Sequence, residues 1–293
     1  MKKGKVRIFF DGLKSEIKKN KNVFAVYLIL RALVIVVAVI SLLNRNLENF
    51  FFCVLSLVLF LLPAFVERQF KVDLPDTLEI IVLMFIFAAE ILGEISSFYM
   101  RVPHWDTMLH TINGFMFAAI GFATVDVLNK SSKVKFNLSP FYLAIMAFCF
   151  SMTVGVLWEF FEFGMDVIFR TDMQKDTVIN TIASVSFDTS LTNTAYVYSD
   201  IVDTVLITAG GERIYLSNYG VNGYLDIGVI DTMKDLLVNF IGAIVFSIIG
   251  YFYVKSRGKG RIAKNFIPTL NESAEENDEE ITECAQCTSG KDE

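Results

Sequence analysis

The chain has 293 residues, of which 54% are hydrophobic and 20% are charged, and its formal net charge is −6. Most of the acidic excess lies in the last part of the chain, whereas lysine and arginine flank long apolar runs. Several of these runs reach the roughly 20 residues that a helix needs to cross a bilayer. This composition excludes a nucleic-acid-binding surface and predicts an integral membrane protein.

The N-terminal 22 residues are rich in lysine and precede the first apolar run. They suit either a short helix on the inner membrane surface or a solvated basic tail. The apolar run that follows is long and lacks a small-residue cleavage pattern, so it predicts a retained helix rather than a signal peptide.

Residues 23–254 are expected to form an all-α membrane bundle of about six helices. The expected spans are, in chain order, Val23–Leu43, Phe50–Val66, Thr77–Phe98, Thr107–Leu128, Phe141–Met165 and Thr232–Val254. Basic connections alternate with connections that carry a single arginine. By the positive-inside rule, both termini are then cytoplasmic.

Residues 169–230 are then expected outside the cytoplasm. Their composition differs from that of the apolar runs, because Thr, Asn, Asp and β-branched residues predominate. Thr204–Thr208 and Arg213–Ser217 read as two strands joined by a turn at Gly210–Gly211. We expect a small β-rich segment that acts as a lid or subdomain, because a simple connection would be shorter.

Residues 255–293 are basic at first and then acidic, with little apolar content, and are expected to be disordered in the cytoplasm. Cys284 and Cys287 in this tail form a CxxC motif, which alone supplies only half a zinc site or a redox pair. Cys53 and Cys149 lie within apolar runs, where packing is the expected role.

Acidic and imidazole side chains occur in four of the expected spans, all toward the outer leaflet. These residues are Glu90, Glu94, Asp106, His110, Glu159, Glu162, Asp166, Asp231 and Asp235. An ionisable group at mid-bilayer costs at least ~2.5 kcal/mol and usually marks a functional site. On each helix they repeat at spacings of three or four residues and so form one polar stripe.

Four of these groups, Glu94, His110, Glu159 and Asp235, fall roughly 9–11 Å outward from the middle of their spans at 1.5 Å per residue. So many carboxylates cannot all ionise in a low-dielectric pocket unless a cation neutralises them or some remain protonated. Oxygen ligands with one imidazole suit Mg²⁺, Mn²⁺, Ca²⁺ or Zn²⁺. Asp106, Asp166 and Asp231 lie at helix ends, where capping is an equally good explanation.

Three motifs carry a resemblance to a known family: HWDTMLHTINGF, LWEFFEF and IDTMKDLLVNFIGA. In this order they resemble the YjdF-like bacterial inner-membrane proteins, over approximately Leu92–Tyr253. The matching positions are Asp106, His110, Gly114, Glu159, Glu162, Asp231, Thr232, Asp235, Gly242 and Ala243. Phe163 departs from a commonly found Trp, and the external segment is longer than usual. The family is uncharacterised, so the resemblance implies a membrane location but no activity.

The leading hypothesis is a metal-dependent membrane enzyme that acts on a lipid-linked or amphiphilic substrate. His110, Glu159, Glu162 and Asp235 would bind the metal, and Glu94 or Asp106 would act as general base or orient a ligand. The alternatives are a cation- or proton-coupled transporter and a scaffold or regulatory protein. The inner halves of the helices are almost wholly apolar, which favours the enzyme over the transporter.

Overall fold

The computed structural model describes residues 21–70, 72–130, 138–256, 265–267 and 269–270. The chain divides into two compact units: the first comprises Met1–Thr153 and Val238–Glu293, and the second Val154–Leu237. The predictions for the N-terminal basic segment and for the Cys284–Cys287 motif lie outside the described residues.

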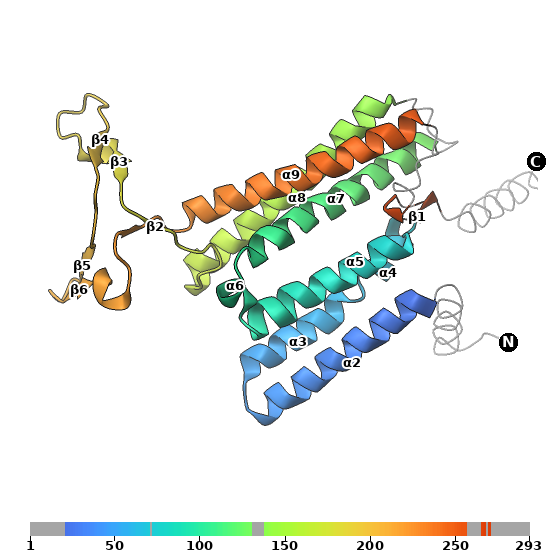
Figure 1. Ribbon diagram of the computed structural model, residues 1–293, viewed down its shortest axis with the longest axis horizontal. Helices are drawn as coiled ribbons and strands as arrows, with labels where there is room; N and C mark the ends of the chain where they lie inside the picture. The colour runs from blue at the N-terminus through green and yellow to red at the C-terminus, as the bar shows by residue number, and fades with distance from the viewer. Residues whose placement is uncertain (1–20, 71, 131–137, 257–264, 268, 271–293) are drawn as a thin grey trace, which may run out of the picture. The chain divides into compact units, whose positions relative to one another are not determined.

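The first unit is built from helices, which Figure 1 shows in chain order. They are α2 (Lys21–Leu43), α3 (Leu47–Leu59), α4 (Leu62–Phe70), α5 (Asp76–Ile86), the π-helix η1 (Phe87–Ile95), α6 (Phe98–Arg101) and α7 (Trp105–Lys130). Helix α2 packs against α3 and α5, and α5 contacts α7. Two further helices, α8 (Pro140–Phe169) and α9 (Val229–Lys255), each continue without interruption from one unit into the other.

Five helical segments in the described residues are long and apolar enough to cross a membrane. They are Lys21–Leu43, Leu47–Gln69, Trp105–Asp126, Pro140–Phe169 and Val229–Lys255. The other expected span, Thr77–Phe98, is helical as well, but it is divided between α5 and η1. The structure therefore confirms a helical membrane bundle, with one expected span built from two kinds of helix.

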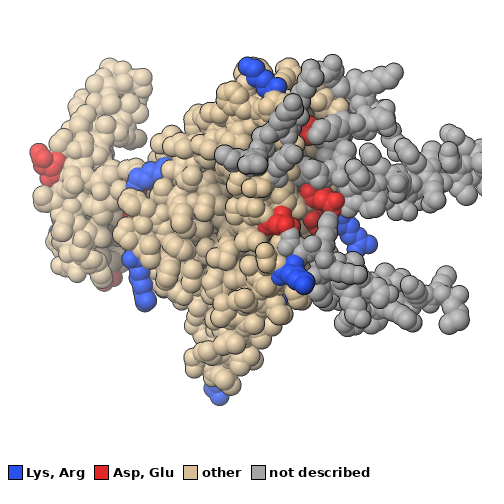
Figure 2. Space-filling model, turned by 45° about the vertical axis from the view of Figure 1, so that its right-hand side comes forward, with Lys and Arg blue, Asp and Glu red and all other residues tan. Residues whose placement is uncertain are grey.

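The surface of the bundle is apolar, as the lipid phase requires. On α2, for example, Leu28 and Ile29 are more than half exposed, whereas Leu30 and Val34 on the opposite face are buried. Figure 2 shows that the helices present a broad uncharged surface on this side, with charged side chains at its margins.

Two glycines let α7 and α9 approach closely within the first unit. A Cβ atom at Gly114 would overlap the backbone carbonyl oxygen of Asn239, and one at Gly242 would overlap the carbonyl oxygen of Thr111. The Ser151 hydroxyl of α8 donates a hydrogen bond of 2.7 Å to the carbonyl oxygen of Gly114. Small residues at helix crossings are the usual means of tight packing in membranes. These contacts place Gly114, Asn239 and Ser151 at one level along the axes of α7, α9 and α8.

Beyond that level the core of the first unit is mostly apolar, with Asp126 and Ser247 as buried polar side chains on α7 and α9. The rings of Phe122 and Phe246 are inaccessible to solvent and meet edge to face, with centroids 6.0 Å apart. Ala118, Ala119 and Ala243 are also fully buried there. Dispersion and close packing therefore hold this half of the helices together.

The second unit contains the expected β-rich segment, as short antiparallel pairs (Figure 1). The pairs are β2 (Val178–Ile179) with β7 (Tyr224–Leu225), β3 (Ile182–Ser184) with β4 (Tyr196–Tyr198), and β5 (Val205–Ile207) with β6 (Arg213–Tyr215). The expected hairpin is the last of these, and its two strands are confirmed.

The turn of this hairpin differs from the prediction by one position. The backbone N–H of Gly211 donates to the carbonyl oxygen of Thr208, so Ala209 and Gly210 are the central residues of the turn. Gly211 follows with a φ of 81°, and the N–H of Thr208 donates to the carbonyl of Glu212. This is a three-residue loop whose last residue needs the left-handed conformation that glycine adopts without strain.

Part of the C-terminal stretch expected to be disordered is ordered. β8 (Thr269–Leu270) pairs in antiparallel fashion with β1 (Val72–Asp73), and the Ile267 side chain is buried in the apolar core. The neighbouring Phe266 also packs against this core, with its ring centroid 5.1 Å from that of Phe115, so two apolar residues hold this short stretch against the helices.

Candidate functional site

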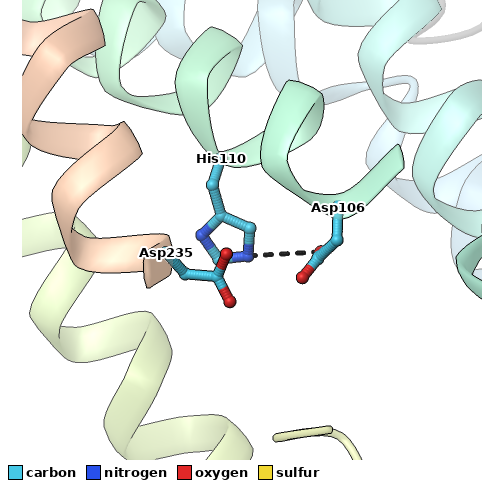
Figure 3. Close-up of side chains that lie close together, drawn as sticks. All are labelled: Asp106, His110 and Asp235. Atoms are coloured by element: carbon cyan, nitrogen blue, oxygen red, sulfur yellow. Dashed lines mark ion pairs between the residues drawn. The ribbon is translucent and has the colours of Figure 1, made fainter. Parts of the chain in front are cut away.

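The helix α7 contributes an aspartate and a histidine that form an ion pair. The Nε2 atom of His110 lies 3.5 Å from a carboxylate oxygen of Asp106, one helical turn earlier (Figure 3). His110 is buried, whereas about a third of the Asp106 side chain is exposed. A carboxylate in this position fixes the orientation of the imidazole ring, which is how protein histidines are prepared for metal or proton chemistry.

The helix α8 contributes two buried glutamates. Glu159 and Glu162 are 4% and 8% exposed, and a carboxylate oxygen of one lies within 4.8 Å of a carboxylate oxygen of the other. The indole N–H of Trp158 donates a 2.8 Å hydrogen bond to Glu162. Two carboxylates this close in a water-poor environment repel each other unless a proton or a cation lies between them.

The helix α9 contributes Asp235 and Asn239, which are 3% and 1% exposed. Their spacing of four residues places them one above the other on the same face of the helix. The Asn239 amide group donates to the sulfur of Met152 at 3.6 Å.

The π-helix η1 carries Glu94, one of the two residues predicted to act as general base or to orient a ligand. Glu94 is exposed on η1, and in the described part of the chain the groups able to hold a metal ion do not include it. Glu90 and Glu94 both lie on η1, whose i to i+5 hydrogen bonding gives a wider turn than the α-helix that the sequence prediction assumed.

Asp166 and Asp231 both bind the loop that follows α8. For these two residues the sequence allowed either a role in the functional site or a helix-capping role. Asp166 accepts hydrogen bonds from the backbone N–H groups of Met173 and Gln174, at 2.6 and 2.9 Å, and from the Thr171 hydroxyl. Asp231 accepts one from the N–H of Lys175 at 2.8 Å. These two carboxylates therefore fasten the loop, which accounts for their position at helix ends.

Asp226, which the sequence did not single out, and Gln174 also attach this loop. Asp226 accepts from the N–H of Thr177 and, at the first turn of α9, from the N–H of Ile230. The Gln174 side chain donates to the hydroxyl of Thr232 at 2.6 Å. The available signal was the sequence Asp226-Ile-Gly-Val ahead of an apolar helix, because aspartate followed by a helix start is a common N-cap.

Two further aspartates organise the β-rich segment. The carboxylate of Asp188 accepts hydrogen bonds from the Ser190 hydroxyl and from the N–H of Thr194, which hold its pKa far below the usual range. Hydrogen bonds from the hydroxyl and N–H of Ser217 likewise lower the pKa of Asp203. Both carboxylates are charged and saturated with donors, which indicates a structural role.

Comparison with known proteins places the chain among membrane proteins without an assigned activity. An uncharacterised protein of Thermotoga maritima is 25% identical over 126 residues, which is 43% of this chain and 63% of that protein. No solved structure matches. A family model described as "Predicted membrane protein (DUF2238)" matches residues 26–256, which include four of the five long helices completely and the first from its sixth residue. The chain therefore belongs to the DUF2238 family of predicted membrane proteins.

Proposed function

We propose that the protein binds one divalent cation through His110, Glu159, Glu162 and Asp235, and that it is a metal-dependent membrane enzyme. The observation that carries the proposal is the burial of all four side chains on membrane-spanning helices, at exposures of 3% to 8%. Charged groups in such positions are costly and are retained where function needs them.

The packing of the first unit supports a common site for these residues. Gly114, Asn239 and Ser151 lie at one level, and the three helices continue beyond it. His110 comes one turn before Gly114, Asp235 comes one turn before Asn239, and Glu159 comes two turns after Ser151. Because successive membrane crossings run in opposite directions, at about 1.5 Å per residue we expect His110, Glu159 and Asp235 about 6–12 Å from that level and Glu162 about 16 Å from it, all on the same side.

The donor set suits a hard or borderline cation. Three carboxylates and one imidazole match Mg²⁺, Mn²⁺, Ca²⁺ or Zn²⁺, and soft thiolates are absent from these positions in the sequence. The Asp106–His110 pair supplies the carboxylate behind a ligating histidine that such sites commonly contain. Asp106, rather than the exposed Glu94, therefore takes the orienting role.

A cation held there would lower the pKa of a bound water or polarise a phosphoryl or carbonyl oxygen. A site within the membrane helices would accept a substrate that partitions into lipid, which is why we propose a lipid-linked or amphiphilic molecule. We further propose the topology indicated by the basic loops, with both termini cytoplasmic and the site open to the outside. The YjdF-like resemblance supports a bacterial inner membrane as the location.

The apolar core of the first unit favours an enzyme over a transporter. Alternating access needs a polar route through both leaflets. On the side of Asn239 that faces away from Asp235, however, α7 and α9 pack through the buried rings of Phe122 and Phe246 and through fully buried alanines. A cation beyond the proposed site would meet a largely apolar core, in which buried polar side chains such as Ser247 and Asp126 are few.

Metal content tests the proposal. Full-length protein purified in detergent without chelator should contain one equivalent of a divalent metal by elemental analysis. His110→Ala and Glu159→Gln should each lose it. Cys284→Ser should retain it, because the CxxC motif lies in the C-terminal tail. Metal-free wild type, or loss of the metal from the cysteine variant alone, would refute a site made by these helices.

A further inference from the structure

Asn239 is the most deeply buried of the polar residues on α9. Only 1% of it is exposed, and its backbone carbonyl is pressed against Gly114 of α7. An asparagine at such a position is expensive in a membrane helix unless both halves of its amide are satisfied.

Only the NH₂ half of this amide has a partner among the residues that the structure describes. It faces the sulfur of Met152 at 3.6 Å, and the amide oxygen, Oδ1, is buried without a hydrogen-bond donor. A thioether sulfur can accept but not donate, so Met152 fixes which half of the amide faces it. The oxygen is thereby left as an oriented and unsatisfied acceptor.

The position of this oxygen relates it to the proposed metal site. Asn239 follows Asp235 by four residues, so the two side chains lie on the same face, one turn apart. Two side chains at this spacing on one helix can bind a single ion, as the paired histidines of HExxH helices do. Amide oxygens are ligands that Ca²⁺ and similar hard cations accept readily.

We propose that the amide oxygen of Asn239 is a further ligand of the cation held by Asp235, on the side of the site nearest the apolar core. This inference rests on the function proposed above and makes it more specific. A neutral, hard oxygen added to three carboxylates and an imidazole favours Mn²⁺, Mg²⁺ or Ca²⁺, which take six or more ligands, over Zn²⁺, which prefers four.

Mn²⁺ titration of the full-length protein in detergent tests the assignment, with Zn²⁺ as competitor. Asn239→Leu keeps a similar volume but removes the oxygen. It should weaken Mn²⁺ binding by about 10- to 100-fold, the range found when a supporting group of a metal site is lost. It should also reduce the preference for Mn²⁺ over Zn²⁺. The metal-free variant should melt no lower than the metal-free wild type, because an unsatisfied polar group has been removed.

Ser247→Ala is the matched control. Ser247 lies two turns further along α9, and its hydroxyl is also buried without a hydrogen-bond partner among the described residues. Its removal should leave the Mn²⁺ affinity unchanged. Asn239→Asp, which retains an oxygen, should bind Mn²⁺ at least as tightly as wild type, and it carries the test if the leucine variant does not fold.

Two results would overturn the inference and are distinguishable. Wild-type protein that binds no divalent metal refutes the proposed function together with the role of Asn239. Wild-type protein that binds Mn²⁺, with unchanged affinity in Asn239→Leu or with tenfold weaker binding in Asn239→Asp, refutes only the role of Asn239.

Discussion

The indole N–H of Trp158 donates a 2.8 Å hydrogen bond to the carboxylate of Glu162, one turn further along α8. Trp158 is 42% exposed, so its ring lies at the surface of the helix while its N–H reaches a buried acid. This bond restricts the rotamers of Glu162 and gives a polar partner to one of its oxygens. Trp158 is therefore a positioning residue for a proposed metal ligand.

Trp158→Phe should weaken metal binding without abolishing it. The phenyl ring preserves most of the apolar contact but removes the donor, and loss of such a supporting hydrogen bond typically costs about 10- to 100-fold in metal affinity. Metal titration of the variant against wild type measures the effect. Phe160→Leu, at a neighbouring exposed aromatic, is the control and should bind normally. Equal affinity in the Trp158 variant would show that Glu162 needs no such partner.

The loop attachment predicts a stability effect separate from metal binding. Asp166→Ala removes the acceptor for two backbone N–H groups and one hydroxyl, and hydrogen bonds to charged groups contribute about 1.5–3 kcal/mol each. The variant should be cleaved faster by trypsin at Arg170 and Lys175, as peptide mapping would show. Asp200→Asn, an exposed position with positive φ that asparagine tolerates, should be cleaved at the wild-type rate.

The depressed pKa of Asp188 predicts acid sensitivity of the β-rich segment. A carboxyl group with a folded pKa below its unfolded value stabilises the fold above the unfolded pKa of about 3.9, and the contribution is lost as the pH falls toward the folded pKa. Hydrogen exchange of the Ser190 and Thr194 amides should therefore accelerate, relative to exposed amides, as the pH falls below about 4. Asp188→Asn should remove this pH dependence, and its persistence in the variant would assign it to other groups.

Accessibility from outside the cell tests the proposed topology. In a background without native cysteines, Asn218→Cys should react with an impermeant thiol reagent in intact cells, and Ser131→Cys should react only after lysis. The basic loops predict this result, because Lys and Arg are retained on the cytoplasmic side. Labelling of the cysteine at 131 alone would invert the topology.

The sequence predicted the helical bundle and the β-rich segment because both depend on local patterns. Runs of about 20 apolar residues have one viable structure in lipid, and a glycine pair between β-branched runs favours a hairpin. The burial of His110, Glu159 and Asp235 also followed from periodicity, since a polar stripe on a membrane helix turns away from lipid.

Other features depend on contacts that no local pattern encodes. The π-helix η1, which carries the exposed Glu94, gives no signal in apolar periodicity. The roles of Asp166 and Asp231 are set by backbone N–H groups of a loop that lies far from Asp231 in the sequence. The environment of Asn239, beside Gly114 and Met152, depends on how the helices cross.

Thermal unfolding with and without chelator tests the central claim, that one divalent cation stabilises the buried acids, most directly. A ligand present at a hundredfold excess over its Kd stabilises the folded state by about 2.7 kcal/mol, and its removal also leaves close carboxylates unneutralised. Chelation should therefore lower the Tm of wild-type protein by several degrees, and should leave the Tm of Glu159→Gln almost unchanged, because that variant no longer holds the ion. Equal shifts in the two proteins, or none in wild type, would contradict the metal site and leave protonated carboxyl groups as the explanation for the buried acids.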